Sequence, residues 1–165
     1  MLKWLPRLSA IALTLGLLAS PGVQASGGAN DDGLGAVRDA TARFHSLEQA
    51  NRSGYTSFLA CFDQPGIGGM GPHYVNFSDL DTTLMPTEPE AVVYEVNGSR
   101  LELVGLEYLV PISAWTSDNP PSLFGHGFYR NDTLGVYFLH AWIWRSNPLG
   151  TFANYNPNVR LCPGH

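Results

Sequence analysis

The positions of the hydrophobic residues follow a helical period in the segment 34–53 and a strand-like alternation after it. In the first segment, apolar side chains recur every three or four residues, which would place them in one stripe on a helix. The stripe consists of Val37, Ala40, Phe44 and Leu47. Gly54 follows, and glycine commonly ends a helix. The pattern predicts one helix over residues 34–53.

Two β-rich runs, residues 91–96 and 99–110, flank the dipeptide Asn97-Gly98. Asn-Gly between two such runs is the strongest short signal for a β-hairpin with a two-residue turn. That turn would place Glu95 opposite Arg100 as a pair of opposite charges. It would also create an apolar face made by Val92, Tyr94, Leu101 and Leu103.

The same alternation, continued along the second run, puts Glu107 on the face of Leu103 and Leu109. A carboxylate buried there costs free energy unless it is paired, hydrogen-bonded or bound to a metal. The alternative is a glutamate at the rim of the sheet, or one that is hydrogen-bonded to a buried tyrosine or tryptophan.

Two more strands are expected, a short one at 73–77 and a long one at 134–144. The long one is apolar on both faces, which is typical of a central strand. A helix followed by antiparallel strands, without βαβ alternation, indicates the α+β class. We therefore expect an N-terminal helix packed on a twisted antiparallel β-sheet.

The first 25 residues have the pattern of a secretory signal peptide. Lys3 and Arg7 precede an apolar run over residues 8–19, and Val23-Gln24-Ala25 is a small-residue cleavage site. The run is too short to span a bilayer, so we expect no transmembrane anchor after cleavage, although a retained anchor is the alternative. The predicted organisation is a signal peptide at 1–25, a flexible linker at 26–33 and a single domain at 34–165, in a periplasmic or secreted protein.

The cysteine content predicts a disulfide, and the charge and lysine content exclude some classes of function. Cys61 and Cys162 are the two cysteines, and in an exported chain an isolated pair predicts a disulfide. A redox or metal-binding thiol pair, the alternative, has no CxxC to support it. The net charge of −5 provides no basic surface of the kind that binds nucleic acid, so we expect no nucleic-acid partner. Lys3 is the only lysine, so Schiff-base chemistry on a mature-chain lysine is excluded.

Three histidines have settings that suit a shared site with Glu107. His73 follows a glycine-rich stretch, His126 lies between two glycines, and His140 lies within an apolar strand. Glycine would let the backbone bend toward one centre. Three imidazoles and a carboxylate suit a transition metal such as Zn or Cu. The alternatives are a metal-free polar cluster that orders the core or lines a small-ligand pocket, and histidines that are unrelated to one another.

Five more residues are candidates to line a ligand pocket because they lie near these positions along the chain. They are Tyr74, Asn76, Tyr108, Trp142 and Trp144. The alternation places the two tryptophans on one face, where they would stack on a ligand or pack in the core.

Four blocks of the chain resemble a family of uncharacterised exported bacterial proteins. The blocks are MGPHYVN (70–76), LVGLEYLVP (103–111), LFGHGF (123–128) and LHAWIWRSNPLGTFANYNPNVRLC (139–162). The resemblance implies an exported bacterial domain, and it implies no catalytic residues.

Three functional hypotheses follow. The first is a binding protein for a small ligand or a metal, built around the histidines and Glu107. The second is a metal-dependent enzyme that uses the same cluster. The third is a structural or interaction module of the cell envelope, with an envelope protein as its partner and no bound ligand.

Overall fold

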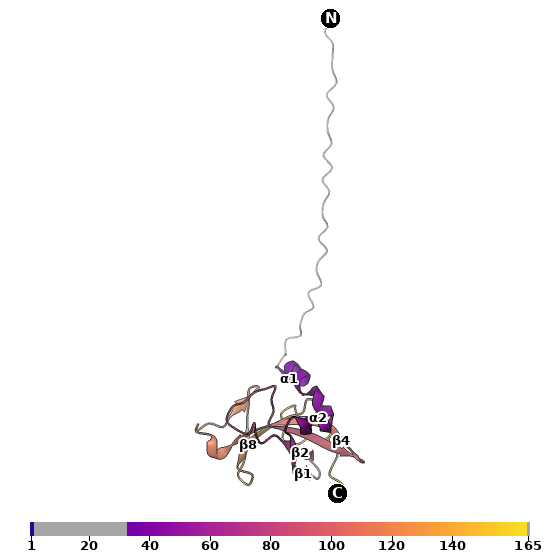
Figure 1. The fold of residues 1–165 in the computed structure, drawn as a ribbon, viewed down its shortest axis with the longest axis vertical. Helices are drawn as coiled ribbons and strands as arrows, with labels where there is room; N and C mark the ends of the chain where they lie inside the picture. Colours follow the sequence, from indigo (N-terminus) through magenta and orange to yellow (C-terminus); the bar gives the residue numbers. More distant parts are fainter. Residues whose placement is uncertain (2–32, 165) are drawn as a thin grey trace.

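The computed structural model describes Met1 and residues 33–164, which form a curled antiparallel sheet with short helices (Figure 1). The main sheet of this described part has the order β1-β2-β3-β4-β8-β7. Its strands are β1 (Thr56–Gln64), β2 (Gly68–Val75), β3 (Ala91–Asn97), β4 (Arg100–Pro111), β8 (Val136–Ala141) and β7 (Tyr129–Asn131). A second small sheet pairs β5 (Ser122–Leu123) with β6 (His126–Gly127), and a short 3₁₀ helix, η2 (Ile112–Ala114), follows β4. The predicted signal peptide and linker lie outside the described residues, except for Met1 and Gly33.

The helical segment is not the single helix that the sequence predicted. It consists of α1 (Leu34–Thr41), the 3₁₀ helix η1 (Ala42–His45) and α2 (Leu47–Arg52). Ser46 is extended, and its hydroxyl accepts a hydrogen bond from the backbone N–H of Gln49 at 3.3 Å. Serine followed three residues later by glutamine has the spacing of a capping box, which begins a new helix. The expected continuous helix was wrong because Ser46 caps α2.

The helical segment packs on one face of the sheet. The buried side chains of Val37 and Phe44 belong to the same core cluster as Val92 and Tyr94 of β3. The hydroxyl of Tyr94 also donates a hydrogen bond to the backbone carbonyl of Phe44 at 2.7 Å. The predicted combination of helices with an antiparallel sheet is therefore present in the described residues. No helix within residues 33–164 is long and apolar enough to cross a membrane.

The hairpin between β3 and β4 has a different register from the expected one. Asn97 pairs with Arg100, so the turn residues are Gly98 and Ser99, and Gly98 has a φ of 61°. Glu95 consequently lies opposite Glu102, and the predicted Glu95–Arg100 pair was wrong. Like charges that face each other are destabilising. Here the guanidinium of Arg145 donates to both carboxylates, with the Glu102 contact at 3.4 Å, which offsets that repulsion.

A β-bulge in β4 decides which way Glu107 points. Tyr94 pairs with Leu103, whereas Val93 pairs with Gly105, so Val104 is an extra residue on β4. An extra residue shifts all later side chains to the opposite face. Glu107 therefore lies on the face away from Leu103, so that part of the predicted face was wrong, whereas the shared face with Leu109 is confirmed. The burial of Glu107 is confirmed, because only 7% of the residue is exposed.

The C-terminal tail is tied back to the edge strand β1. The predicted disulfide between Cys61 and Cys162 is present. The tail also forms a bridge with β2, because Gly69 and Asn156 exchange two backbone hydrogen bonds of 3.1 Å each. These links bring residues 154–155 of the tail beside the face of the sheet opposite the helices.

Candidate functional site

His73, Glu107 and His140 meet on the face of the sheet opposite the helices. Glu107 of β4 pairs directly with His140 of β8, and His73 of β2 pairs with Val93 of β3. Neighbouring strands lie about 4.8 Å apart, so β2 and β8 would be about 14 Å apart in a flat sheet. The curl of the sheet closes that gap, since the Nε2 atoms of the two histidines are 3.2 Å apart.

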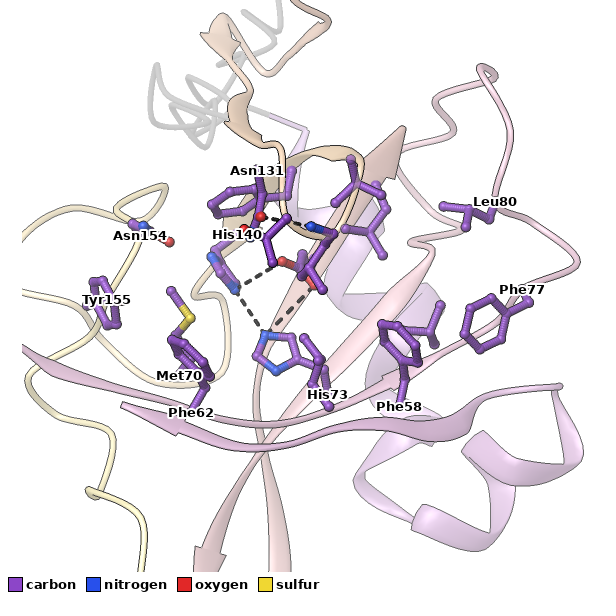
Figure 2. A pocket seen from close by; sticks show the side chains of 18 residues that line it. Phe58, Phe62, Met70, His73, Phe77, Leu80, Asn131, His140, Asn154 and Tyr155 are labelled. Atoms are coloured by element: carbon purple, nitrogen blue, oxygen red, sulfur yellow. Dashed lines mark hydrogen bonds and ion pairs between the residues drawn. The ribbon is translucent and has the colours of Figure 1, made fainter. Parts of the chain in front are cut away.

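The ligand atoms of the three residues form a compact triangle (Figure 2). Nε2 of His140 lies 3.5 Å from one carboxylate oxygen of Glu107, and Nε2 of His73 lies 3.8 Å from the other. All three ligand atoms lie within 4.8 Å of one another. The two histidines are each only 1% exposed. Two nitrogens and one oxygen are therefore held together away from bulk water.

Burial favours the uncharged form of all three groups. It lowers the pKa of His73 to about 4 and that of His140 well below its usual value. Burial also raises the pKa of Glu107 to about 8, and the charge of Glu90 adds to that rise. The reason is that a low-dielectric site disfavours the charged form of either kind of group.

Each histidine has an oxygen-bearing neighbour besides Glu107. The backbone carbonyl of Gly71 raises the pKa of His73, and the side chain of Asn154 raises that of His140, both against the larger effect of burial. Figure 2 shows Asn154 on the side of His140 that faces away from His73. Neither buried Nδ1 completes a hydrogen bond of good geometry with these or other described residues. A proton on each Nδ1 would leave both Nε2 lone pairs directed at the centre of the cluster, as metal binding requires.

The cluster forms the polar floor of an apolar pocket of about 440 Å³. The apolar side chains that line it are Phe58, Leu59, Phe62, Met70, Val75, Phe77, Leu80, Leu109, Leu134, Val136 and Phe138. Asn131, Thr133, Asn154 and Tyr155 complete the lining. Among the described residues that line the pocket, Glu107 is the one carboxylate, and none is lysine or arginine. At the rim, Phe58 and Phe77 are half exposed and meet edge to face with ring centroids 5.2 Å apart.

His126, the third predicted histidine ligand, is not part of this cluster. It lies exposed in β6, and its ring contacts Phe152 at a centroid distance of 4.3 Å. Because β6 pairs with β5 in a separate sheet, the glycines around His126 shape a small hairpin and do not aim the ring at the other histidines. The predicted four-residue site is thus reduced to three residues.

The five predicted pocket residues lie elsewhere, and this prediction was wrong. Tyr74 and Tyr108 point to the helical face, where Tyr108 donates to the carbonyl of Pro86 at 2.6 Å. Asn76 orders the next loop through a hydrogen bond to Asp79. The two tryptophans do not share a face, because β8 ends at Ala141. Trp144 packs beside His45 in the helical core, and Trp142 stacks on His140 with ring centroids 5.1 Å apart.

Sequence reasoning missed the phenylalanines at the mouth of the pocket. Phe58 and Phe62 lie on β1, whose register shifts between them, and Phe77 follows β2. The continuous apolar run at 58–62 was a usable signal for a strand, but it does not show which side chains share a face. The contribution of Asn154 had no such signal, since its place depends on the path of the tail.

Glu90 is another buried carboxyl group, outside the His73–Glu107–His140 cluster. It is 1% exposed, and its side chain accepts a hydrogen bond from the backbone N–H of Leu109 at 2.9 Å. Burial raises its pKa to about 7, and hydrogen bonds from the backbone N–H groups of Leu109 and of Glu90 itself oppose that rise. The other ionisable groups that act on it or that it acts on are Asp79, Asp81, Glu107, Tyr55 and Tyr108.

We expect Glu90 to make the protein less stable as pH rises. The folded pKa lies above the unfolded value of 4.5, so the contribution to stability is complete below pH 4.5 and is lost as pH rises through 7. Between pH 4 and pH 8 the wild type should lose about 2–3 kcal/mol more unfolding free energy than Glu90→Gln. Urea unfolding of both proteins at the two pH values measures this difference. Equal losses would show that the pKa of Glu90 is not raised in the folded protein.

Comparisons with protein-family models, with curated proteins and with solved structures find no match for this chain. The resemblance to exported bacterial proteins therefore stays a prediction. The chemistry of the site has to be argued from its own residues.

Proposed function

We propose that this chain is an exported binding protein in which His73, Glu107 and His140 hold one divalent transition-metal ion, such as Zn²⁺ or Cu²⁺. Imidazole and carboxylate are ligands that both ions accept. Export is supported by the Cys61–Cys162 disulfide, because such bonds persist in oxidising compartments.

The observation that carries the proposal is the approach of the two Nε2 atoms to 3.2 Å. A contact of that length is made either by an N–H···N hydrogen bond, with a proton on one Nε2, or by two lone pairs that share a positive centre. Two nitrogens bound to one ion at about 2.05 Å would be about 2.9–3.4 Å apart, for angles of about 90–110°. The observed separation falls within that interval. The contacts to Glu107, at 3.5 and 3.8 Å, are slightly longer and would close with a small rotation of its side chain.

The surroundings of the two imidazoles also fit metal binding. A histidine that binds a metal usually donates its other N–H to an oxygen, which fixes the tautomer. Gly71 and Asn154 supply such oxygens beside His73 and His140. A bound cation favours neutral imidazole and ionised carboxylate, so it would reverse the effect of burial on Glu107.

Metal titration of the full chain, exported and purified without a polyhistidine tag, tests the proposal. We expect one Zn²⁺ or Cu²⁺ per chain. His140→Ala and Glu107→Gln should each weaken binding beyond the roughly 10–100-fold that loss of a supporting hydrogen bond costs. Because Trp142 stacks on His140, bound Cu²⁺ should also quench tryptophan fluorescence, and Trp142→Phe should reduce that response.

His126→Ala is the matched control, since it removes an exposed histidine outside the cluster. It should leave the stoichiometry and affinity unchanged. Circular dichroism of each variant separates loss of the site from loss of the fold. If the chain binds no ion, or if His126→Ala weakens binding as much as His140→Ala, the metal proposal fails and the hypothesis of a ligand-free envelope module gains ground.

A metal-dependent enzyme is the second candidate. The feature that favours it is the position of the cluster at the floor of a pocket, because three protein ligands leave at least one coordination position free for water or substrate. In that case the ion would act as a Lewis acid or activate a bound water. Turnover of a substrate by the metal-loaded chain, lost in Glu107→Gln, would distinguish the enzyme from a binding protein.

A further inference from the structure

We propose that the pocket above the His73–Glu107–His140 cluster binds a monocarboxylic acid with an apolar tail, whose carboxylate completes the coordination of the metal. The proposal rests on the proposed metal site and adds the class of ligand.

The shape and lining of the pocket determine which apolar tail the ligand can have. Its volume of about 440 Å³ lies in the range of about 300–1,000 Å³ that is usual for small-molecule sites. At about 30 Å³ for each water-sized group, it has room for roughly 12–15 non-hydrogen atoms. Figure 2 shows His73 and His140 between two apolar groups, one with Phe62 and Met70 and the other with Phe58 and Phe77. A medium-length alkyl chain or an aryl-alkyl group matches this lining.

The charge of the metal site at the floor of the pocket determines which head group the ligand can have. Two neutral imidazoles and one carboxylate leave a divalent ion with one uncompensated positive charge. Among the described residues that line the pocket, no second acid is present to balance it, and the rest of the lining is neutral. A buried charge without a partner is costly, so a ligand with a single negative charge at one end is favoured over a neutral ligand or a dianion.

The same lining makes the metal the only strong anchor for that head group. No lysine or arginine is present among the described lining residues, so a carboxylate has no ion-pair partner there without the ion. In the apo protein it would instead meet the carboxyl of Glu107. Binding of the acid should therefore depend on metal, whereas binding through the apolar walls alone would not.

The mouth of the pocket provides the surface on which the tail lies. Phe58, Phe62 and Phe77 are half exposed although they line the pocket, and Leu134 is exposed beside them. Aromatic side chains left half in water gain burial when an apolar chain covers them. Because they are far from fully buried, Phe58 and Phe77 are also positions at which substitution should spare the fold.

Calorimetric titration with decanoic acid and 1-decanol, which have the same chain length, tests the inference. The protein is first loaded with Zn²⁺ and desalted, so that no free ion precipitates the acid. We expect the loaded protein to bind decanoic acid about 100-fold more tightly than the apo protein does. It should also bind the acid about 100-fold more tightly than the alcohol, because only the carboxylate neutralises the ion.

A pair of rim substitutions tests the placement of the tail without touching the metal ligands. Phe58→Ser/Phe77→Ser should weaken decanoic acid binding about 10-fold or more and leave Zn²⁺ stoichiometry and affinity unchanged. Ile67→Ser, which removes a similarly exposed apolar side chain outside the pocket lining, is the control and should change neither.

The outcomes separate the two proposals. If Zn²⁺ binds but acid and alcohol bind equally, or the apo protein binds the acid equally well, the inference is overturned and the metal site stands. If the rim variant binds the acid like wild type, the assigned pocket is wrong. If the earlier titration finds no metal binding, the metal site fails, and the inference that rests on it fails with it.

Discussion

Gly71→Ala is expected to destabilise the protein by about 3–5 kcal/mol and to abolish metal binding. Gly71 lies on β2 with a φ of +82°, a conformation that costs alanine about 1–2 kcal/mol. A Cβ atom there would also overlap the backbone carbonyl oxygen of Tyr94 on β3. No rotamer change relieves a clash with backbone, so β2 must move away from β3. His73 lies two residues further along β2 and would move with it.

Gly66→Ala is the matched control for this experiment. Gly66 has the same φ of +82°, but no described atom lies within 4 Å of the added Cβ. It should cost only the backbone term, about 1–2 kcal/mol, and keep the metal site. Urea unfolding and Zn²⁺ titration of both variants measure the two effects. Equal losses in the two variants would contradict the role assigned to the close approach of β2 and β3.

The glycine-rich stretch before His73 therefore has a structural explanation. A Cβ at Gly68 would come within 2.6 Å of the backbone of Asn156, and one at Gly69 within 2.7 Å of the backbone carbonyl of Arg160. These glycines let the C-terminal tail cross close over β2. They place His73 indirectly, because they allow the tail to pair with β2 at Gly69, on the edge of β2 away from β1.

The sequence predicted the burial of the cluster better than its geometry. Histidine and glutamate within strongly apolar runs indicated that His140 and Glu107 face an interior, which the structure confirms. The face of Glu107 was predicted wrongly because the extra residue Val104 reverses the alternation. Gly105 inside a strand is the sequence signal for that bulge.

The other differences between the predicted and the observed site come from contacts between distant parts of the chain. Glycines on both sides of His126 are as compatible with a hairpin turn as with a loop that presents a metal ligand. The local sequence therefore cannot distinguish these two structures. Trp142 and Trp144 diverge because β8 ends where Trp142 turns to donate its backbone N–H to Thr151. Asn154 reaches His140 only because the tail folds back over β2, which no local pattern indicates.

Replacement of both cysteines, Cys61→Ser/Cys162→Ser, is expected to lower the free energy of unfolding by about 4–5 kcal/mol. The two residues are 101 positions apart in the sequence, so the bond closes a long loop and restricts the unfolded chain strongly. Urea unfolding of the oxidised wild type and of the double variant measures the loss. Wild type in reductant should match the double variant, and reductant should not change the double variant further.

The same variant should still bind metal at concentrations where it is folded, but less tightly. The tail keeps contacts that do not depend on the bond, including the backbone bridge between Gly69 and Asn156 and the hydrogen bond from the Arg160 N–H to Glu95 at 3.1 Å. His73, Glu107 and His140 lie on three strands of the sheet and need no disulfide to meet. Asn154, which lies beside His140, belongs to the tail and would be held less firmly, and loss of such a supporting contact costs roughly 10–100-fold in metal affinity. Unchanged affinity in the double variant would show that these hydrogen bonds alone fix the tail over the site.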